Sequence, residues 1–411
     1  MANTLITSSW VTKEVALEFT NEITFVKQLN RDYDDQFIVE GAHVGSTVQA
    51  RLPQQFQVTS GQAFQQRNLS DQTTPVTLTD QLNVGMGWSS AQKTTDLDDI
   101  RERYINPAAA ALANVVDANA FQAVYPNISQ AIGTPGAGGP TATSTYLSGG
   151  VKLTDLAVPL NRRVAVLDQQ QMATLANTQA ALFNPSGYVS GVAEKGMFAG
   201  AQLGFSKWFQ DANRPLHTTG TFTASTPVTT AGGQTGSSIT TSGWASGATT
   251  LNRGDVLTFA GVYSVNPLSY VSTGRLRQFV VTATISDTTG AITLPIAPSI
   301  IPSGQRQNVS NSPGNGVAIS VWGSAAVGGV LATAVSPVGL LFHPDVATFV
   351  MADLAEPNGG AKATFVRSKA WALSIRMVEQ YQSTTDQNLT RLDVLVGTAV
   401  LQERLGVRVQ G

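Results

Sequence analysis

The chain has 411 residues, of which 42% are hydrophobic and 13% are charged, with a formal net charge of −2 and no cysteine. This composition excludes a disordered chain, and the missing cysteine excludes disulfides, thiolate catalysis and zinc–sulfur sites. The near-neutral charge argues against a general nucleic-acid binder, which would carry a basic patch. Globular proteins are about 25% charged, so a surface this poor in charge indicates a carbohydrate-like β-protein or a subunit covered by its neighbours.

Residues 8–30 predict an amphipathic helix. Its apolar side chains recur on one face at Val11, Val15, Phe19, Ile23 and Val26. Such a face serves equally for docking on the helix's own domain and for binding a partner, so both interpretations stay open. The first ten residues lack the basic and apolar regions of a secretory signal peptide.

Residues 37–92 predict an extended excursion with two strands, Val44–Leu52 and Thr74–Val84, separated by a segment rich in Gln, Ser and Gly. In the second strand, Val76, Leu78, Leu82 and Val84 should point one way. Because an isolated two-stranded hairpin is marginal in water, we expect a neighbouring subunit to cover it. The contact candidates in this region are Arg51, Phe56, Phe64 and Arg67.

A long helix is predicted from Thr95 to Tyr125, with Thr95 as its N-cap and acidic residues in its first turn. The adjacent Asp98 and Asp99 are interpreted as helix-terminal charges and not as an acid/base pair. Pro107 should bend the helix. The residues of its apolar stripe are Leu97, Ile100, Tyr104, Ala108, Ala111, Leu112 and Val115.

The next segment alternates loop, strand and helix. Ile132–Pro140 is rich in Gly and Pro and predicts a loop. Arg163–Leu167 predicts a strand, followed by a helix from Asp168 to Leu182 with Asp168 as its cap.

Residues 218–325 differ sharply in composition from the flanking sequence, and no Lys, Arg, Asp or Glu occurs between Arg214 and Arg253. Short strands with turn signals predict a small inserted barrel or sandwich. The triplet Arg253–Gly254–Asp255 matches a cell-adhesion tripeptide, but its place before a strand favours a tight turn. The predicted strands are Val256–Ala260, Gln278–Ile285 and Ala291–Ile296, and Phe279, Val281, Ala283 and Ile285 should share one face.

Three further strands are predicted near the end of the chain, at Trp371–Val378, Arg391–Val400 and Gly406–Val409. The uncharged stretch 307–344 is interrupted by Gly, Ser and Thr, so buried strands are a better interpretation than a membrane helix.

Recognisable catalytic or metal-binding patterns do not occur in this sequence. The three histidines, His43, His217 and His343, are far apart and lack carboxylates at metal-ligand spacing. No nucleophile elbow, P-loop or HExxH motif is present. We therefore predict a protein that is not an enzyme and needs no cofactor or metal.

Several long phrases carry a family resemblance. The phrase TTDLDDIRERYINPAAAALANVVDANAF (94–121) resembles the long-helix region of tailed-bacteriophage major capsid proteins. WVTKEVALEFTNEITFVKQLNRDYDDQF (10–37), LNRGDVLTFAGVYSVNP (251–267) and RLDVLVGTAVLQERLGVRV (391–409) are similar to other parts of the short-tailed-phage coat type, which carries an inserted β-domain. The phrases occur in the same order as in that family.

The resemblance implies an α+β fold of the Hong Kong 97 type. Its parts would be an N-terminal arm (1–36), an extended loop (37–93), a spine helix with peripheral domain (94–150), a first axial part (151–217), the inserted β-domain (218–325) and an axial and peripheral return (326–411).

The implied function is a virion capsid subunit assembled in the host cytoplasm. Its copies would form pentamers and hexamers of an icosahedral procapsid, together with a scaffolding protein and a portal protein. The shell would expand as double-stranded DNA is packaged, enclosing the DNA without sequence-specific binding and without any membrane. Whether a decoration protein also binds is left open. No lysine lies between Lys27 and Lys93, so covalent crosslinking through a loop lysine, known in the wider fold, is not expected.

A glycan-binding tail or surface β-protein is the alternative. It would need exposed aromatic side chains in a groove, for which Trp244, Tyr263 and Tyr270 are the nearby candidates. A hydrolase has the least support, since no nucleophile–base pair is recognisable.

Overall fold

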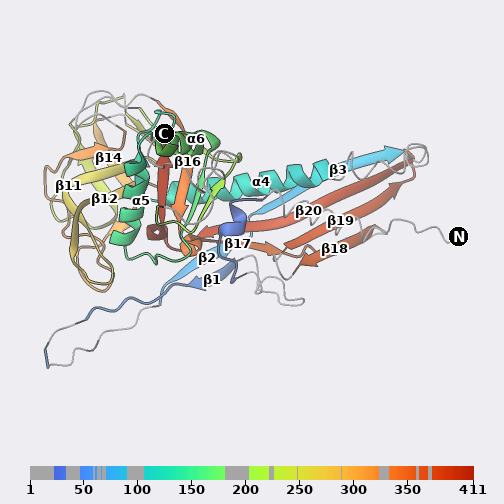
Figure 1. Cartoon of the computed structure of the whole chain (residues 1–411), viewed down its shortest axis with the longest axis horizontal. Helices are drawn as coiled ribbons and strands as arrows, with labels where there is room; N and C mark the ends of the chain where they lie inside the picture. The colour runs from blue at the N-terminus through green and yellow to red at the C-terminus, as the bar shows by residue number, and fades with distance from the viewer. Residues whose placement is uncertain are drawn as a thin grey trace. The chain divides into compact units, whose positions relative to one another are not determined.

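The computed structural model describes residues 23–33, 47–58, 61–62, 66, 71–89, 106–180, 203–221, 226–247, 249–287, 289–323, 333–357, 361–368 and 373–411 (Figure 1). The chain divides into two compact units. The first comprises residues 1–50, 73–121 and 347–399, and the second comprises 51–72, 122–346 and 400–411.

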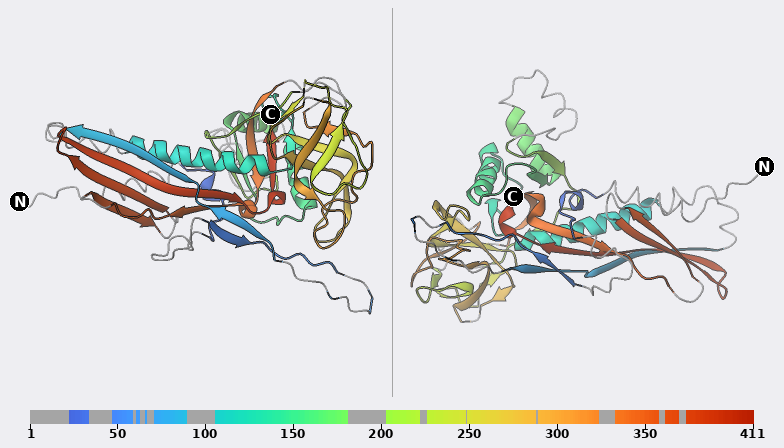
Figure 2. Two further views of the ribbon diagram at one scale, coloured as in Figure 1. Left: turned by 180° about the vertical axis from the view of Figure 1, so that it is seen from behind. Right: turned by 90° about the horizontal axis from the view of Figure 1, so that it is seen from below.

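The first unit is built on an antiparallel sheet with the strand order β17-β20-β19-β18, in which β3 also pairs with β20. Its long strands lie side by side in Figures 1 and 2. On β20, Leu392, Val394 and Val396 are buried, as their alternation predicts. The strands are β3 (Asp80–Ser89), β17 (Ala347–Ala352), β18 (Lys362–Ser368), β19 (Leu373–Gln382) and β20 (Gln387–Val400).

Helix α4 (Asn106–Val124) runs alongside this sheet (Figures 1 and 2). The predicted cap at Thr95 and the acidic first turn lie outside the described residues. The predicted stripe is right at Leu112 and wrong at Ala111 and Val115, which are exposed, Val115 by 46%. The buried face passes through Ala109, Leu112, Val116 and Ala120. The four alanines at 108–111 cover a full turn of the helix. The spacing of apolar residues could therefore not show which side of that turn is buried.

Residues 24–26, far from α4 along the chain, are bound to this helix by a buried carboxylate. Asp117 accepts hydrogen bonds from the backbone N–H groups of Thr24, Phe25 and Val26, at 3.3, 3.2 and 2.9 Å. The ring of Phe25 stacks on that of Phe121 with centroids 4.3 Å apart. The predicted α-helix is wrong for residues 23–30, which form a bend and the short 3₁₀ helix η1 (Val26–Gln28).

The predicted strand Thr74–Val84 is two strands in two sheets. β2 (Thr73–Thr77) pairs with β1 (Thr47–Arg51) in a two-stranded sheet, whereas β3 pairs with β20 along its whole length. The expectation of an isolated two-stranded hairpin is therefore wrong for β3, which pairs with β20 of its own chain. Gly397 of β20 comes so close to Thr77, the last residue of β2, that an added Cβ would lie 2.2 Å from the Thr77 carbonyl oxygen.

The second unit contains a mixed sheet with the order β4-β21-β16-β5-β6, and β7 also pairs with β16. We call it the host sheet. β4 runs parallel to β21, and β5 runs parallel to β6. The strands are β4 (Ala131–Gly133), β5 (Val164–Leu167), β6 (Lys207–Gln210), β7 (Leu216–Thr218), β16 (Val335–Phe342) and β21 (Gly406–Gln410).

Two helices accompany the host sheet. α6 (Gln169–Ala180) is predicted by the sequence, and Asp168 caps it by accepting the Gln170 N–H at 3.3 Å. α5 (Thr143–Asp155) was not predicted, because it carries two adjacent glycines in its middle. Gly149 allows α5 to approach the sheet, since an added Cβ would lie 2.6 Å from Cδ1 of Leu341. Three 3₁₀ turns complete the unit: η3 (Tyr125–Asn127), η4 (Pro344–Val346) and η5 (Glu403–Leu405).

The inserted segment forms a six-stranded antiparallel barrel with the order β15-β11-β12-β14-β9-β8. A bridge between Val228 and Ala318 joins its first strand to its last, so the barrel is closed. Phe259 and Phe279 meet edge to face in the core at 5.4 Å. Its strands are β8 (Val228–Thr229), β9 (Gly236–Ser242), β11 (Val256–Val265), β12 (Ser272–Val281), β14 (Ala291–Ile300) and β15 (Ile319–Val321).

The predicted strand Gln278–Ile285 is wrong at its C-terminal end. β12 ends at Val281, and Ile285–Ser286 forms the separate strand β13, which pairs with β10 (Thr250–Leu251). Phe279 and Val281 are buried in the barrel core as predicted, whereas Ala283 is exposed. The uncharged stretch around Val317–Val335 contains β15 and the start of β16, and among the described helices none combines the length and apolarity needed to cross a membrane.

Candidate functional site

A buried polar junction joins the barrel to the host sheet. Its first part is the turn that leads into β11. The carboxylate of Asp255 accepts the backbone N–H of Asn252 at 2.8 Å and that of Gly220 at 3.0 Å. Its Oδ1 also lies 3.0 Å from Nε2 of His217, on β7. Asp255 and His217 are 3% and 2% exposed, so this pair is sealed from solvent.

Arg408 on β21 reaches the same turn from the host sheet. Its Nη1 donates to the carbonyl oxygen of Gly254 at 2.7 Å. Burial lowers the pKa of Arg408 to about 10, while Tyr125 and Asp255 oppose that shift. The ring of Tyr125 meets the His217 ring edge-on at 5.9 Å, and burial raises the pKa of Tyr125. The triplet recognised in the sequence is therefore an internal turn, with only Arg253 exposed.

The second part of the junction lies along β12. Arg277 donates to Oε1 of Glu403 at 2.8 Å, and Oε2 of Glu403 accepts from Ser129 at 2.6 Å. The side-chain amide of Gln278 pairs with the backbone of Ala131 on β4: its Oε1 accepts the N–H at 2.9 Å, and its Nε2 donates to the carbonyl at 3.2 Å. The outer face of β12 thus completes hydrogen bonds of the host sheet's edge.

Lys152 of α5 closes this contact. Its Nζ donates to the Ala131 carbonyl at 2.7 Å and to Oε1 of Gln278 at 2.6 Å. It also lies 5.1 Å from the ring centroid of Trp322. Burial, with a smaller contribution from the Arg275 charge, lowers the pKa of Lys152 to about 7.

This arrangement is suited to holding two domains together and not to catalysis. His217 and Asp255 have the spacing of a base and its orienting carboxylate, but their burial denies a substrate access. Within the described ranges, no cluster of three His, Asp or Glu residues could hold a metal ion.

The predicted contact residues and the residues predicted for the long helix fall into three groups. Ile23, Val26 and Leu112 are buried in the first unit, so for Ile23 and Val26 the structure favours docking on the chain itself over contact with a partner. Arg51 and Phe56 are exposed, Phe56 by 60%. The candidates outside the described residues are Val11, Val15, Phe19, Phe64, Arg67, Asp98, Asp99, Ile100 and Tyr104.

Sequence reasoning missed Lys152, Arg408 and Asp117, and it left the role of His217 open. A charged residue in an otherwise apolar strand, such as Arg408 in β21, is the one signal that was available. The partners of these groups are distant in sequence: 147 residues separate Ala131 from Gln278, so no local pattern links them.

Comparison with known proteins places the chain in a family. The family described as "P22 coat protein - gene protein 5" matches residues 1–411. No curated protein matches the chain in sequence. Among solved structures, "Mycobacterium phage Che8" is 12% identical with a TM-score of 0.46 and covers 94% of this chain and 90% of its own. "Capsid of Ralstonia phage GP4" is 9% identical with a TM-score of 0.43, covering 100% and 93%. "CUS-3 coat protein I-domain" is 25% identical with a TM-score of 0.19, covering 24% and 96%.

The family match over the whole length assigns this α+β chain to the phage capsid proteins, whose fold is the Hong Kong 97 type that the sequence resemblance implies. The chain belongs to the P22 coat protein family. It is a major capsid protein of a tailed bacteriophage and a structural component of the virion.

Proposed function

We propose that the chain builds a procapsid in the host cytoplasm with a scaffolding protein and a portal protein, and that this procapsid expands as double-stranded DNA is packaged. The full-length family match carries the proposal. The net charge of −2 supports it, because a container must hold DNA without binding it tightly. In this proposal the protein has no enzymatic role, and a decoration protein is a further partner to be tested.

The exposed apolar side chains that follow β1 support contact with a neighbouring subunit. Phe56 and Val58 are 60% and 89% exposed. Large apolar side chains at such exposure are typical of an interaction surface when they lie close together. We assign the extended loop (37–93) this role, with the N-terminal arm (1–36) as a second contact through its residues before Ile23.

The barrel acts in this proposal as an internal brace of its own subunit. The junction supports this role, since Asp255 and Gln278 of the inserted segment bind His217 and Ala131 of the host sheet. Lys152 of α5 donates to Gln278 from the host side. A glycan-binding role has no comparable support. Trp244, one of its three aromatic candidates, is 4% exposed and donates its indole N–H to Thr241 within the barrel.

Co-expression of the full-length chain with its scaffolding protein, followed by negative-stain electron microscopy, tests the proposal. We expect closed shells of uniform size that contain the scaffolding protein. Expression without the scaffolding protein should give fewer or misshapen particles. Equal yields of regular shells in both cases would remove the scaffolding protein from the pathway.

A further inference from the structure

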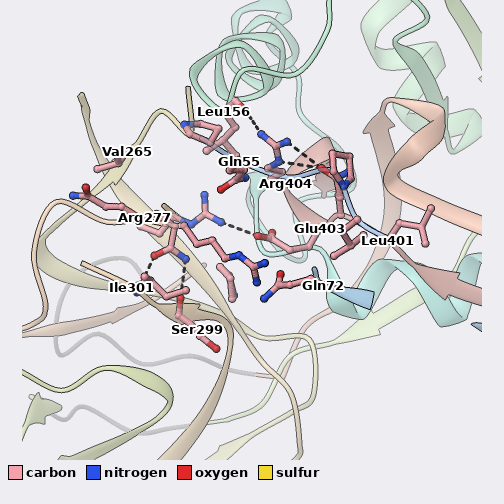
Figure 3. A pocket seen from close by; sticks show the side chains of 18 residues that line it. Gln55, Gln72, Leu156, Val265, Arg277, Ser299, Ile301, Leu401, Glu403 and Arg404 are labelled. Atoms are coloured by element: carbon pink, nitrogen blue, oxygen red, sulfur yellow. Dashed lines mark hydrogen bonds and ion pairs between the residues drawn. The ribbon is translucent and has the colours of Figure 1, made fainter. Parts of the chain in front are cut away.

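The second unit contains a cavity of about 330 Å³ beside the junction (Figure 3). Three parts of the chain form its walls: the segment after β1 with Gln72, the segment 401–404, and barrel residues on β12, β14 and the adjoining loops. The volume lies in the range of small-molecule sites. Its walls include apolar side chains such as Leu52, Leu156 and Leu401.

The charged side chains of this cavity are mostly cationic. Arg277, Arg306 and Arg404 line it together with a single carboxylate, Glu403. Three positive charges and one negative charge give a formal charge of +2 for the lining. Figure 3 shows the Arg277 guanidinium pointing to Glu403, and the Arg404 guanidinium near them, directed toward Leu156.

Glu403 is already committed to other donors. One of its carboxylate oxygens accepts from Arg277 and the other from Ser129, at 2.8 and 2.6 Å. Within the described residues, Arg404 donates to neutral oxygens, those of Gln402 and the Leu156 carbonyl. Arg277 is only 2% exposed. Its Nε is buried and makes no hydrogen bond within the described part of the chain.

The arginines also repel one another. Burial lowers the pKa of Arg404, Glu403 acts in the opposite direction, and the Arg277 charge lowers it further. A bound anion would offset this repulsion, and a guanidinium group presents paired N–H donors that match the oxygens of a phosphate or carboxylate.

We propose that this cavity binds a dianionic oxyanion of the phosphate type, held by Arg277, Arg306 and Arg404. The formal charge of +2 matches a dianion better than a single carboxylate. An anion in this position would connect the base of the extended loop, the barrel and the segment before β21. The proposal does not depend on the proposed assembly pathway.

Calorimetric titration of the full-length chain with inorganic phosphate tests the site, with chloride at equal ionic strength as the reference because screening alone also changes surface electrostatics. We expect saturable binding of one phosphate per chain and weaker binding of acetate. Heat no greater than that of the chloride reference would overturn the proposal. Acetate binding as tight as that of phosphate would overturn the assignment to a dianion.

Two variants locate the binding. Arg306→Gln and Arg404→Gln should each raise the Kd for phosphate about tenfold, the usual size of one charge-assisted contact. Arg162→Gln removes the same charge from an exposed position of the same unit outside the cavity and should leave the Kd within about twofold. Arg306 is only half-buried, so its variant decides the question if Arg404→Gln does not fold. Equal weakening by Arg162→Gln and Arg306→Gln would show diffuse attraction and refute the site.

Discussion

Nε2 of His217 lies 3.0 Å from Oδ1 of Asp255, where both side chains are almost completely buried. The contact joins strand β7 of the host sheet to the turn before β11, so it fixes the barrel at the point where the chain enters it. Asp255 also accepts two backbone N–H groups, and its removal would leave three donors, two of them buried, without their anionic partner.

Asp255→Asn should lower the free energy of unfolding by about 3 kcal/mol, because a buried charged acceptor is lost while its donors remain. Asp345→Asn is the matched control. Asp345 pairs with His343 at 3.3 Å, but its side chain is 43% exposed, and its loss should cost less than about 1 kcal/mol. Urea denaturation followed by tryptophan fluorescence measures both. Equal losses would show that the buried pair contributes no more than a surface pair.

Gly254→Ala should destabilise the chain more than Gly261→Ala. Both glycines have positive φ, +101° and +75°, so both substitutions carry backbone strain of about 1 kcal/mol. At Gly254 the added Cβ would also lie 3.0 Å from Cε1 of His217, whereas no heavy atom lies within 4 Å at Gly261. The expected difference is about 1–2 kcal/mol, measured by chemical denaturation. An equal effect would mean that the His217 ring moves aside at no cost.

Stability should rise with pH above about 7 because of Lys152. Its pKa is about 7 in the folded chain, against a usual value of 10.5. Between these values the unfolded chain holds the proton and the folded chain does not, so raising the pH favours folding by up to about 1.4 kcal/mol per unit. Below both values the contribution is constant. Denaturation midpoints from pH 6 to 10 measure the trend.

Two lysine variants isolate this contribution. Lys152→Met should flatten the rise in stability between pH 7 and 10, whereas Lys207→Met, at an exposed position, should leave it unchanged. A Lys152→Met chain with the wild-type slope would assign the pH dependence to other groups.

Ile23→Asp should prevent folding and not merely assembly, since Ile23 is 2% exposed and a carboxylate in an apolar core costs several kcal/mol. Phe56→Asp should give a folded subunit that assembles poorly, because Phe56 is 60% exposed. Circular dichroism with sedimentation of particles separates the two outcomes. Normal shells from Phe56→Asp would remove this side chain from the proposed subunit contact.

Subunits from mature shells should migrate as single chains on denaturing gels, since the extended region lacks a lysine between Lys27 and Lys93. The shell would then be stable through many weak contacts acting together. A ladder of covalent multimers would contradict this.

Much of the strand arrangement could be predicted from the sequence. The alternation of Leu392, Val394 and Val396 predicted one buried face of β20, and Asp168 marked the start of α6. The errors occurred where a local pattern admitted more than one answer. The four alanines of α4 did not define a face, and the paired glycines of α5 concealed a helix that packs closely on Leu341.

The sequence by itself determined that this is a cysteine-free α+β chain with an inserted β-domain and the capsid family's order of segments, because hydrophobic period, turn residues and composition are local properties. Only the tertiary structure decided that Asp117 binds the backbone around Val26 and that β3 pairs with β20. It also decided that Asp255, Arg408 and Lys152 attach the barrel to the host sheet. The physical reason is that a buried polar group must find a partner wherever the fold provides one. For Asp117 and Val26 that partner lies 91 residues away along the chain.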